Sequence, residues 1–405
     1  MYGGCMTTTH SAPARVLAPD IARGLMLLLI ALANMPWHLS SYETDGLSMH
    51  DPDGGVLDRA WQAVAIIAID GRSYPLFAFL FGYGIWQLYR RQVSAGASRE
   101  EARRLLRRRH WWMLAFGAVH ALLLWGGDII GAYGLVGLLA CWLFLDRSDR
   151  TLAVWAGVLT GLLVFGAVSS WIGGAALGLA GDAGGSVSVP TAAESDTFLH
   201  SVPIRLATWA TVLLGQGLLT LAVPVAVLLA LLAARHSVLE RADEHRRLLT
   251  TTALVGVGIG WAGGAVAFAH FVGALADLPS WTFQMLSIAT GLAGGIGYAA
   301  AFGLIGVAWQ RRGVGVVGRA LVATGKRSMT SYVLQSVLFV PVLSVWGLGL
   351  GGVLTEWQGA LYAVCVWLTT VLIATAMERR GQRGPFERLL RHLAYPKVVP
   401  SKASS

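Results

Sequence analysis

The chain has 405 residues, of which 55% are hydrophobic and 13% are charged, and its formal net charge is +9. Because soluble domains carry about 25% charged residues, this composition excludes an ordinary soluble enzyme and indicates a polytopic helical membrane protein of the all-α class. Cys5, Cys141 and Cys365 lack CxxC spacing, which argues against a disulfide framework and against a thiolate metal site.

Ten transmembrane spans are predicted from apolar runs that approach or exceed the roughly 18–20 residues needed to cross a bilayer. In chain order they are residues 22–40, 74–90, 111–127, 129–145, 152–172, 206–233, 250–274, 283–308, 329–350 and 359–377. The transmembrane domain is therefore expected to cover 22–377, between an N-terminal tail (1–21) and a basic C-terminal tail (378–405). The first tail lacks the basic residues and the cleavage site of a secretory signal, so the first span is expected to be retained.

Two further segments have their own pattern. Residues 56–69 are apolar but short, and Ser73 and Pro75 follow as helix-start signals. This predicts an interfacial or re-entrant helix before the second span. Residues 173–203 are rich in Gly, Ser and Pro, which predicts a long outer loop that acts either as a lid or as a plain linker.

Basic residues alternate between the connections. Six of the segments hold 28 of the 31 Lys and Arg, and only Arg59, Arg72 and Arg205 lie elsewhere; the six are 1–23, 90–110, 146–151, 234–249, 309–327 and 378–405. The positive-inside rule then predicts that both termini lie in the cytoplasm. The positive charge is explained by orientation and by anionic lipid headgroups, so no nucleic-acid partner is expected.

Ionisable groups inside a membrane are costly and mark candidate sites. His120 is expected near the midplane of the third span, with Asp128 about 12 Å further along a helix that rises 1.5 Å per residue. This spacing forbids a direct hydrogen bond between them and favours an Arg72–Asp128 pair at the outer boundary. Purely structural roles for these groups remain an alternative.

Other polar groups have simpler interpretations. Asp20 and Arg23 share one helix face at i,i+3. Gln216, Gln284 and Gln335 are expected to hydrogen-bond between helices.

Four stretches and the tail resemble one family. They are APDIARGLMLLLIALANM (18–35), IAIDGRSYPLFAFLFGYG (67–84), RRRHWWMLAFGAVHALLLWGGDIIGAYGLVGLL (107–139), ATGKRSMTSYVLQSVL (323–338) and RGPFERLLRHLAYP (383–396). In this order they resemble the YeiB-like bacterial membrane proteins, whose shared region is called domain of unknown function 418. The sequence departs from the family pattern at two places. It has Asp20-Ile-Ala-Arg23-Gly24 where the family usually has D-x-L-R-G, and Phe386 where the tail motif commonly has Leu. Neither change removes a charged group.

The opening of the first span is also distantly similar to that of membrane acyltransferases of the acyltransferase-3 and heparan-glucosaminide acetyltransferase type. The similarity implies acyl transfer from cytoplasmic acyl-CoA to an extracytoplasmic or lipid-linked hydroxyl or amine, with no tightly bound cofactor. Asn34 stands where the sugar acyltransferases carry a histidine, so His120 would have to act as the base or acyl carrier. The remaining implied roles are acceptor binding by Asp128, Arg72, Asp70 and Asn34, and donor or headgroup binding by Asp20, Arg23, Lys326 and Arg327.

Two other classes of function stay open. His120, Asp128 and Arg72 could instead line a conduit of a transporter or channel for a small solute or proton. A membrane scaffold with only structural polar groups is the second alternative. Lipids are the expected partners, and a homodimer is left open.

Overall fold

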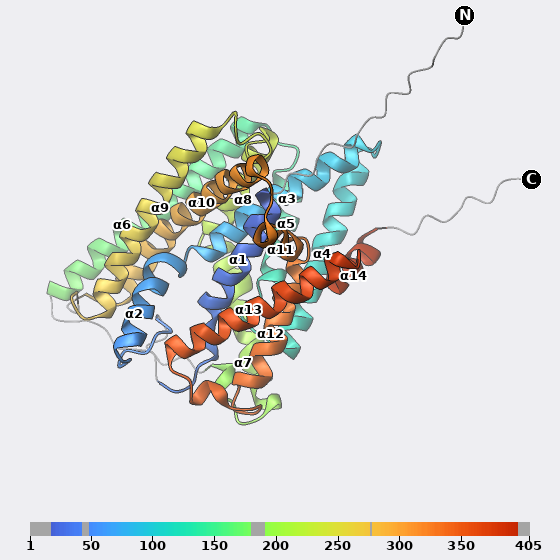
Figure 1. The fold of residues 1–405 in the computed structure, drawn as a ribbon. Helices are drawn as coiled ribbons and strands as arrows, with labels where there is room; N and C mark the ends of the chain where they lie inside the picture. Colours follow the sequence, from blue (N-terminus) through green and yellow to red (C-terminus); the bar gives the residue numbers. More distant parts are fainter. Residues whose placement is uncertain (1–17, 43–47, 180–190, 276–277, 396–405) are drawn as a thin grey trace, which may run out of the picture.

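The computed structural model describes residues 18–42, 48–179, 191–275 and 278–395, and every regular element in these ranges is helical (Figure 1). In chain order the helices are α1 (Ala18–Asn34), η1 (Met35–His38), α2 (Val56–Val64), η2 (Ala65–Ile69), α3 (Ser73–Ser94), α4 (Arg99–Leu123), α5 (Ile129–Leu143), α6 (Asp149–Leu179), η3 (Ala192–Glu194), α7 (Phe198–Thr211), η4 (Val212–Leu219), α8 (Ala222–Arg235), α9 (Arg246–Phe271), α10 (Trp281–Arg312), α11 (Val316–Gly325), α12 (Ser328–Leu343), η5 (Leu350–Gly352), α13 (Glu356–Arg379) and α14 (Pro385–Ala394). The predicted all-α class is confirmed.

Within the part of the chain that the structure describes, seven stretches are long and apolar enough to cross a membrane. They are Ala18–His38, Val56–Ser94, Asp149–Gly178, Phe198–Leu219, Arg246–Phe271, Trp281–Arg312 and Glu356–Arg379. Each overlaps one predicted span. The three other predicted spans lie on α4, which begins with a run of arginines, and on α5 and α12, which are apolar but have only 15 and 16 residues. The chain is a polytopic helical membrane protein.

The helices on one side of the bundle, α6, α9 and α10, run together (Figure 1). Their outward residues are large and apolar, such as Phe165 and Leu254, which are 70% and 71% exposed. Their inward residues are small: a Cβ on Gly260 of α9 would come within 2.7 Å of Gly294 in α10. Large apolar residues outside and glycines at the crossing are typical of helices packed in lipid.

The second predicted span is preceded by a broken helix. The chain runs from α2 into the π-helical turn η2, breaks at Asp70–Arg72, and continues as α3. Gly71 has φ +72°, which a glycine adopts without the strain other residues meet. Because Ala65, Ile66 and Ile69 are buried, the segment 56–69 enters the bundle and forms the first part of a broken span that continues in α3.

The predicted span 206–233 is wrong as a single helix. It is divided into α7, the π-helical η4 and α8, and the break lies at Leu221, whose φ is +62°. The long apolar run concealed this break, although Gly215 and Gly217 precede it and Pro224 lies in the first turn of α8. Both broken spans thus have the same plan: an α-helix, a π-helical segment, a break and a second α-helix.

The second halves of the two broken spans, α3 and α8, pack side by side. A Cβ on Gly82 of α3 would come within 3.0 Å of Ala230 in α8. Further along, the Tyr83 hydroxyl bonds Glu240, just after α8. The two helices therefore run in the same direction, and both begin at the level of the breaks.

The predicted outer loop 173–203 is shorter than expected. Helix α6 continues to Leu179, and α7 already begins at Phe198. Residues 180–190, the centre of the predicted lid, lie outside the described residues. After them, the carbonyl of Ala193 accepts a hydrogen bond of 2.9 Å from the Val345 N–H.

We call the two ends of the bundle the basic end and the acidic end. The basic end gathers the arginine-rich connections, as in the Arg235–Asp149 and Arg311–Asp243 pairs of 2.7 Å. The acidic end carries the turn 124–128 and residues 48–55, 272–275, 278–280 and 344–355.

Candidate functional site

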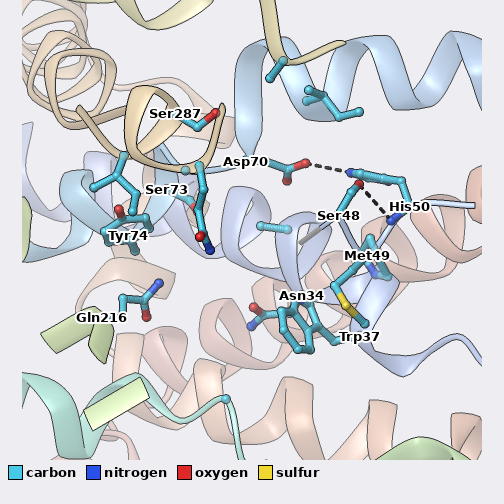
Figure 2. Close-up of a pocket in the computed structure, with 18 of the residues that line it drawn as sticks. Asn34, Trp37, Ser48, Met49, His50, Asp70, Ser73, Tyr74, Gln216 and Ser287 are labelled. Atoms are coloured by element: carbon cyan, nitrogen blue, oxygen red, sulfur yellow. Dashed lines mark hydrogen bonds and ion pairs between the residues drawn. The ribbon is translucent and has the colours of Figure 1, made fainter. Parts of the chain in front are cut away.

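A cavity of about 790 Å³ lies between the acidic end and the two helix breaks. Its size is that of a small-molecule site. Its walls include aromatic rings and uncharged polar groups, several of which are seen in Figure 2; they include Asn34, Trp37, Ser73, Tyr74, Trp125, Thr208, Thr211, Gln216, Thr220, Phe271, Phe283, Gln284 and Ser287. The lining reaches the breaks at Asp70–Tyr74 and Thr220.

The cavity brings together three of the predicted acceptor residues. Asn34, Asp70 and Arg72 line it, from the end of α1 and from the break before α3. His120 and Asp128 are absent from its lining, although Gly127 and Ile129 beside them contribute to the wall. One turn of chain, Leu124–Asp128, therefore separates the cavity from His120.

His120 and Asp128 form a buried pair. His120 Nδ1 lies 2.8 Å from Asp128 Oδ1, and the side chains are 4% and 0% exposed. The second oxygen of Asp128 accepts the Gly131 N–H at 2.7 Å and so caps the start of α5. His120 Nε2 has no hydrogen-bond partner among the described residues. An aspartate that holds Nδ1–H leaves Nε2 as the available basic nitrogen.

The prediction that these two residues are too far apart is wrong. It assumed helix up to residue 127, whereas α4 ends at Leu123. The N–H groups of Leu124 and Trp125 both turn back onto the His120 carbonyl, at 2.8 and 3.0 Å. The chain then reverses through Gly126 and Gly127, which returns Asp128 to the level of His120.

Arg72 does not pair with Asp128, contrary to the prediction. Its guanidinium donates to the carbonyls of Ile66, Asp70 and Gly260. Gly260 is near the middle of α9, so Arg72 lies deep in the bundle rather than at the outer boundary. Arg72 is 2% exposed, and it ties the first helix break to α9.

Tyr332 of α12 completes the surroundings of His120. Its ring centroid is 5.4 Å from that of His120. Its hydroxyl is 3.4 Å from both the Gly127 carbonyl and the Ile129 N–H, on either side of Asp128. Tyr332 thus packs against the turn that carries the aspartate.

The position of α12 is fixed by the tail motif. Glu387 of α14 accepts the N–H groups of Met329 and Thr330 at 2.8 and 3.1 Å and the Thr330 hydroxyl at 2.5 Å. These are the donors that the first turn of a helix leaves without partners. The Gly-Pro-Phe-Glu segment therefore has a structural role as the cap of the helix that carries Tyr332.

A second buried cluster lies at the cavity wall, and its His50 and Glu356 were not predicted. His50 Nε2 is 2.7 Å from Asp70 Oδ2, and His50 Nδ1 is 2.6 Å from Glu356 Oε2 (Figure 2 shows the Asp70 contact). His50 belongs to the connection before α2, and Glu356 begins α13. They are 306 positions apart in polar segments, so no sequence pattern signals the contact.

The predicted donor-side cations are at the basic end and carry structural contacts. Arg23 is 3.6 Å from Asp20, as predicted, and also donates to the Leu80 carbonyl. Lys326 and Arg327 both bind Glu378 of α13, at 2.5 and 2.7 Å. One carboxylate faces two cations there, so a net positive charge remains.

The other predicted polar groups lie either between helices or at the cavity wall. Gln335 donates to the Leu27 carbonyl at 3.1 Å, an interhelical bond as expected. Gln216 and Gln284 instead line the cavity. Across the described part of the chain, no cluster of three or more His, Cys, Asp or Glu could hold a metal ion.

Comparison with known proteins supports the resemblance seen in the sequence. Residues 233–397 match the model of DUF418, described as a protein of unknown function. The similarity to this family therefore rests on the C-terminal part of the chain. This match contains α9–α14, and with them Glu356 and the Glu387 cap, while His120 and Asp128 precede it.

The relatives extend over nearly the whole chain. The uncharacterized protein YxaH of Bacillus subtilis is 25% identical over 409 residues, 94% of each chain. The uncharacterized protein YeiB of Escherichia coli is 24% identical over 419 residues, 94% of this chain and 97% of its own. The predicted YeiB-like relationship is confirmed.

Proposed function

We propose that this protein is a transmembrane acyltransferase that uses His120 as its general base. The observation that carries the proposal is the His120–Asp128 hydrogen bond, which leaves His120 Nε2 without a partner among the described residues. An oriented imidazole with one available nitrogen is what proton abstraction from a hydroxyl or amine requires.

In the proposed reaction the acceptor occupies the cavity and contacts Asn34 and Asp70. Its hydroxyl or amine attacks the thioester carbon of an acyl-CoA while its proton passes to His120 Nε2. The carbon–sulfur bond breaks, and the CoA sulfur leaves and takes up a proton. Because the turn Leu124–Asp128 separates the cavity from His120, this turn must move aside for the acceptor to reach Nε2.

The donor is proposed to approach from the basic end. Phosphate groups bind where cations are in excess of carboxylates, and Lys326 and Arg327 share the single carboxylate of Glu378. Arg23, with Asp20 beside it, is the other candidate for donor or headgroup contact. We place the protein in a bacterial cytoplasmic membrane, with anionic lipids at this end.

The test uses purified protein in nanodiscs of bacterial lipid extract, which offers hydroxyl and amine acceptors, with acetyl-CoA as the donor probe, and mass spectrometry measures release of CoA and acetylation of the lipid. Native protein is expected to release CoA, and His120→Ala to lower the rate by about 10²- to 10⁴-fold, the usual contribution of a general base. Asp128→Asn is expected to lower it less, because the imidazole stays in place but loses its orientation. His392→Ala, an exposed histidine on α14, is the matched control and should match native protein.

Two results would count against acyl transfer. The first is the absence of CoA release by native protein. The second is CoA release that survives in His120→Ala while tryptophan fluorescence shows the variant to be folded.

Transport is the second candidate, and the two helix breaks favour it. Broken helices whose ends meet a cavity inside the membrane are a recurring feature of secondary transporters. Here both breaks line the cavity, at Asp70–Tyr74 and at Thr220. If proteoliposomes show proton flux without CoA chemistry, this candidate replaces the first.

A further inference from the structure

Residues 48–54, which lead into α2, lie along the wall of the cavity. Of these, Ser48, Met49, His50 and Pro52 line the cavity. Met49 and His50 are 8% and 5% exposed, whereas Pro52 and Asp53 are exposed. Residues 48–54 therefore present one face to the cavity and the other to the solvent at the acidic end.

His50 fastens this segment at two points. It bonds Asp70 at the first helix break and Glu356 at the start of α13. Glu356 also accepts the Asp51 N–H and the Gln62 side-chain amide, the latter at 2.8 Å. One buried carboxylate, 1% exposed, thus gathers residues 50–51, α2 and α13.

Asp70 differs from Glu356 in its exposure. Its side chain is 31% exposed, and it lines the cavity. The same carboxylate that holds His50 is therefore within reach of a molecule in the cavity. A ligand that donates a hydrogen bond to Asp70 would compete with His50 for it.

We propose that residues 48–54 form a gate at the acidic end of the cavity, and that His50, held between Asp70 and Glu356, keeps this gate closed. Opening requires the two His50 contacts to break, together with the bond from the Asp51 N–H to Glu356 and the bond from the Tyr42 hydroxyl to the Met49 carbonyl, while the gate remains attached to α2. Ligand exchange with the outside is then limited by this step. The gate is independent of acyl transfer, since a transporter would need the same access.

The carboxylates of Asp70 and Glu356 strengthen the attachment of His50 through their charge. Both ring nitrogens face carboxylates, so both must carry a proton and the ring is an imidazolium. Burial lowers the pKa of His50, but the hydrogen bonds to Asp70 and Glu356 outweigh it and raise the pKa to about 10. The other charged or titratable groups near this cluster are Tyr42, Asp51, Asp58, Arg59 and Arg72.

The direction of the pH effect follows from this raised pKa. A group whose pKa is higher in the closed form stabilises that form fully below its ordinary pKa, and the stabilisation disappears as the pH rises through the raised value. The gate is therefore expected to be held most firmly below pH 6.5, the ordinary pKa of histidine, and to loosen progressively as the pH rises from there to about 10.

The test measures access to a reporter cysteine inside the cavity. Ser287→Cys on α10 is introduced after the three native cysteines have been replaced by alanine, and the protein is held in nanodiscs. The rate of labelling by a charged maleimide is then measured. His50→Gln and Glu356→Gln, which keep the side-chain size, are each expected to raise the rate at least tenfold.

His236→Gln at the basic end is the matched control. It also loses a histidine–carboxylate contact, 3.0 Å to Asp149, but it is expected to leave labelling unchanged. If His50→Gln does not fold, Asp70→Asn is measured in its place, because it removes the charge of the other carboxylate bonded to His50. Labelling rates that agree within twofold in native protein and in every folded variant of the cluster would overturn the gate.

A pH series separates the charge of His50 from its size. The ratio of the His50→Gln rate to the native rate is expected to fall toward one above pH 10, because native protein then opens as well. Both proteins carry the same cysteine, so the change in its own reactivity cancels in the ratio. A ratio that stays constant through this range would contradict a role for the imidazolium.

Discussion

At the scale of single residues, the His120–Asp128 pair depends on space left by glycines. Gly117 of α4 faces Gly131 of α5, and a Cβ at Gly117 would overlap both the Gly131 backbone and the Asp128 carboxylate. The close approach of α4 and α5 makes the 2.8 Å hydrogen bond between His120 and Asp128 possible. Replacing Gly117 therefore tests the geometry of the site while His120 and Asp128 themselves stay unmutated.

We expect Gly117→Ala to destabilise the protein by about 1–3 kcal/mol, the usual cost of adding a methyl group to a tightly packed core. The obstruction at Gly117 is rigid backbone, so the neighbours have little room to yield. Thermal unfolding followed by tryptophan fluorescence in detergent measures the effect. Gly161→Ala in α6, where a Cβ would meet nothing within 4 Å, is the matched control and should unfold at or above the native temperature. Equal melting temperatures for the two variants would show that α4 and α5 are not so close.

At the scale of elements, the C-terminal helix acts on the site from the basic end. Glu387 caps α12, and Tyr332 of α12 packs against the turn that carries Asp128. Helix α14 has no contact with the His120–Asp128 pair, yet it fixes the depth of the helix that supports it. Part of the candidate site is thus set by a segment outside the apolar spans.

Glu387→Ala is expected to lower stability by about 0.5–2 kcal/mol, the range measured for lost helix caps. It should also speed proteolytic cleavage after α13, because α14 loses its main polar attachment to α12. Melting temperature and limited trypsin digestion measure the two effects. Glu244→Ala, which removes an exposed glutamate paired only with Arg241, should have little effect on either. If the two variants behave alike, the cap does not hold α14.

At the scale of the whole molecule, the distribution of charge sets the orientation. Arginine-rich connections gather at one end of the bundle, and at the other end the described connections and helix starts carry Asp51, Asp53, Asp58 and Glu356 against Arg59. From the positive-inside rule we expect the basic end to face the cytoplasm. The gate and the cavity would then open to the outside of the cell.

Single-cysteine labelling in intact cells is expected to confirm this orientation. A cysteine at Val353, which is 74% exposed at the acidic end, should react with a membrane-impermeant maleimide. A cysteine at Arg383, between α13 and α14, should react only after the cells are permeabilised. The reverse pattern would invert the topology and, with it, the proposed sides of donor and acceptor.

The sequence was enough to predict the elements made of long apolar runs, because length and hydropathy are local properties. It also predicted Asn34, Asp70 and Arg72 as members of a polar site, because charged and amide side chains are costly in apolar surroundings and mark candidate sites. It failed where the chain changes direction. The prediction continued the helix through Leu124–Gly127, whereas the chain turns back there and brings Asp128 to His120. It also failed at Leu221, where a leucine adopts a left-handed conformation, and at the His50–Glu356 contact, which depends on tertiary packing.

The two helix breaks have an electrical consequence. The first N–H groups of α3 and α8 lack helical partners, so water or a ligand must satisfy those that face the cavity. A water-filled cavity conducts ions far better than packed protein does, which leaves α8, about 21 Å long at 1.5 Å per residue, to insulate the rest of the span. When the proposed gate is open and the cavity joins the outside solution, most of the membrane voltage would fall between the breaks and the basic end, and a charge that moves between donor and cavity would cross that steepened field.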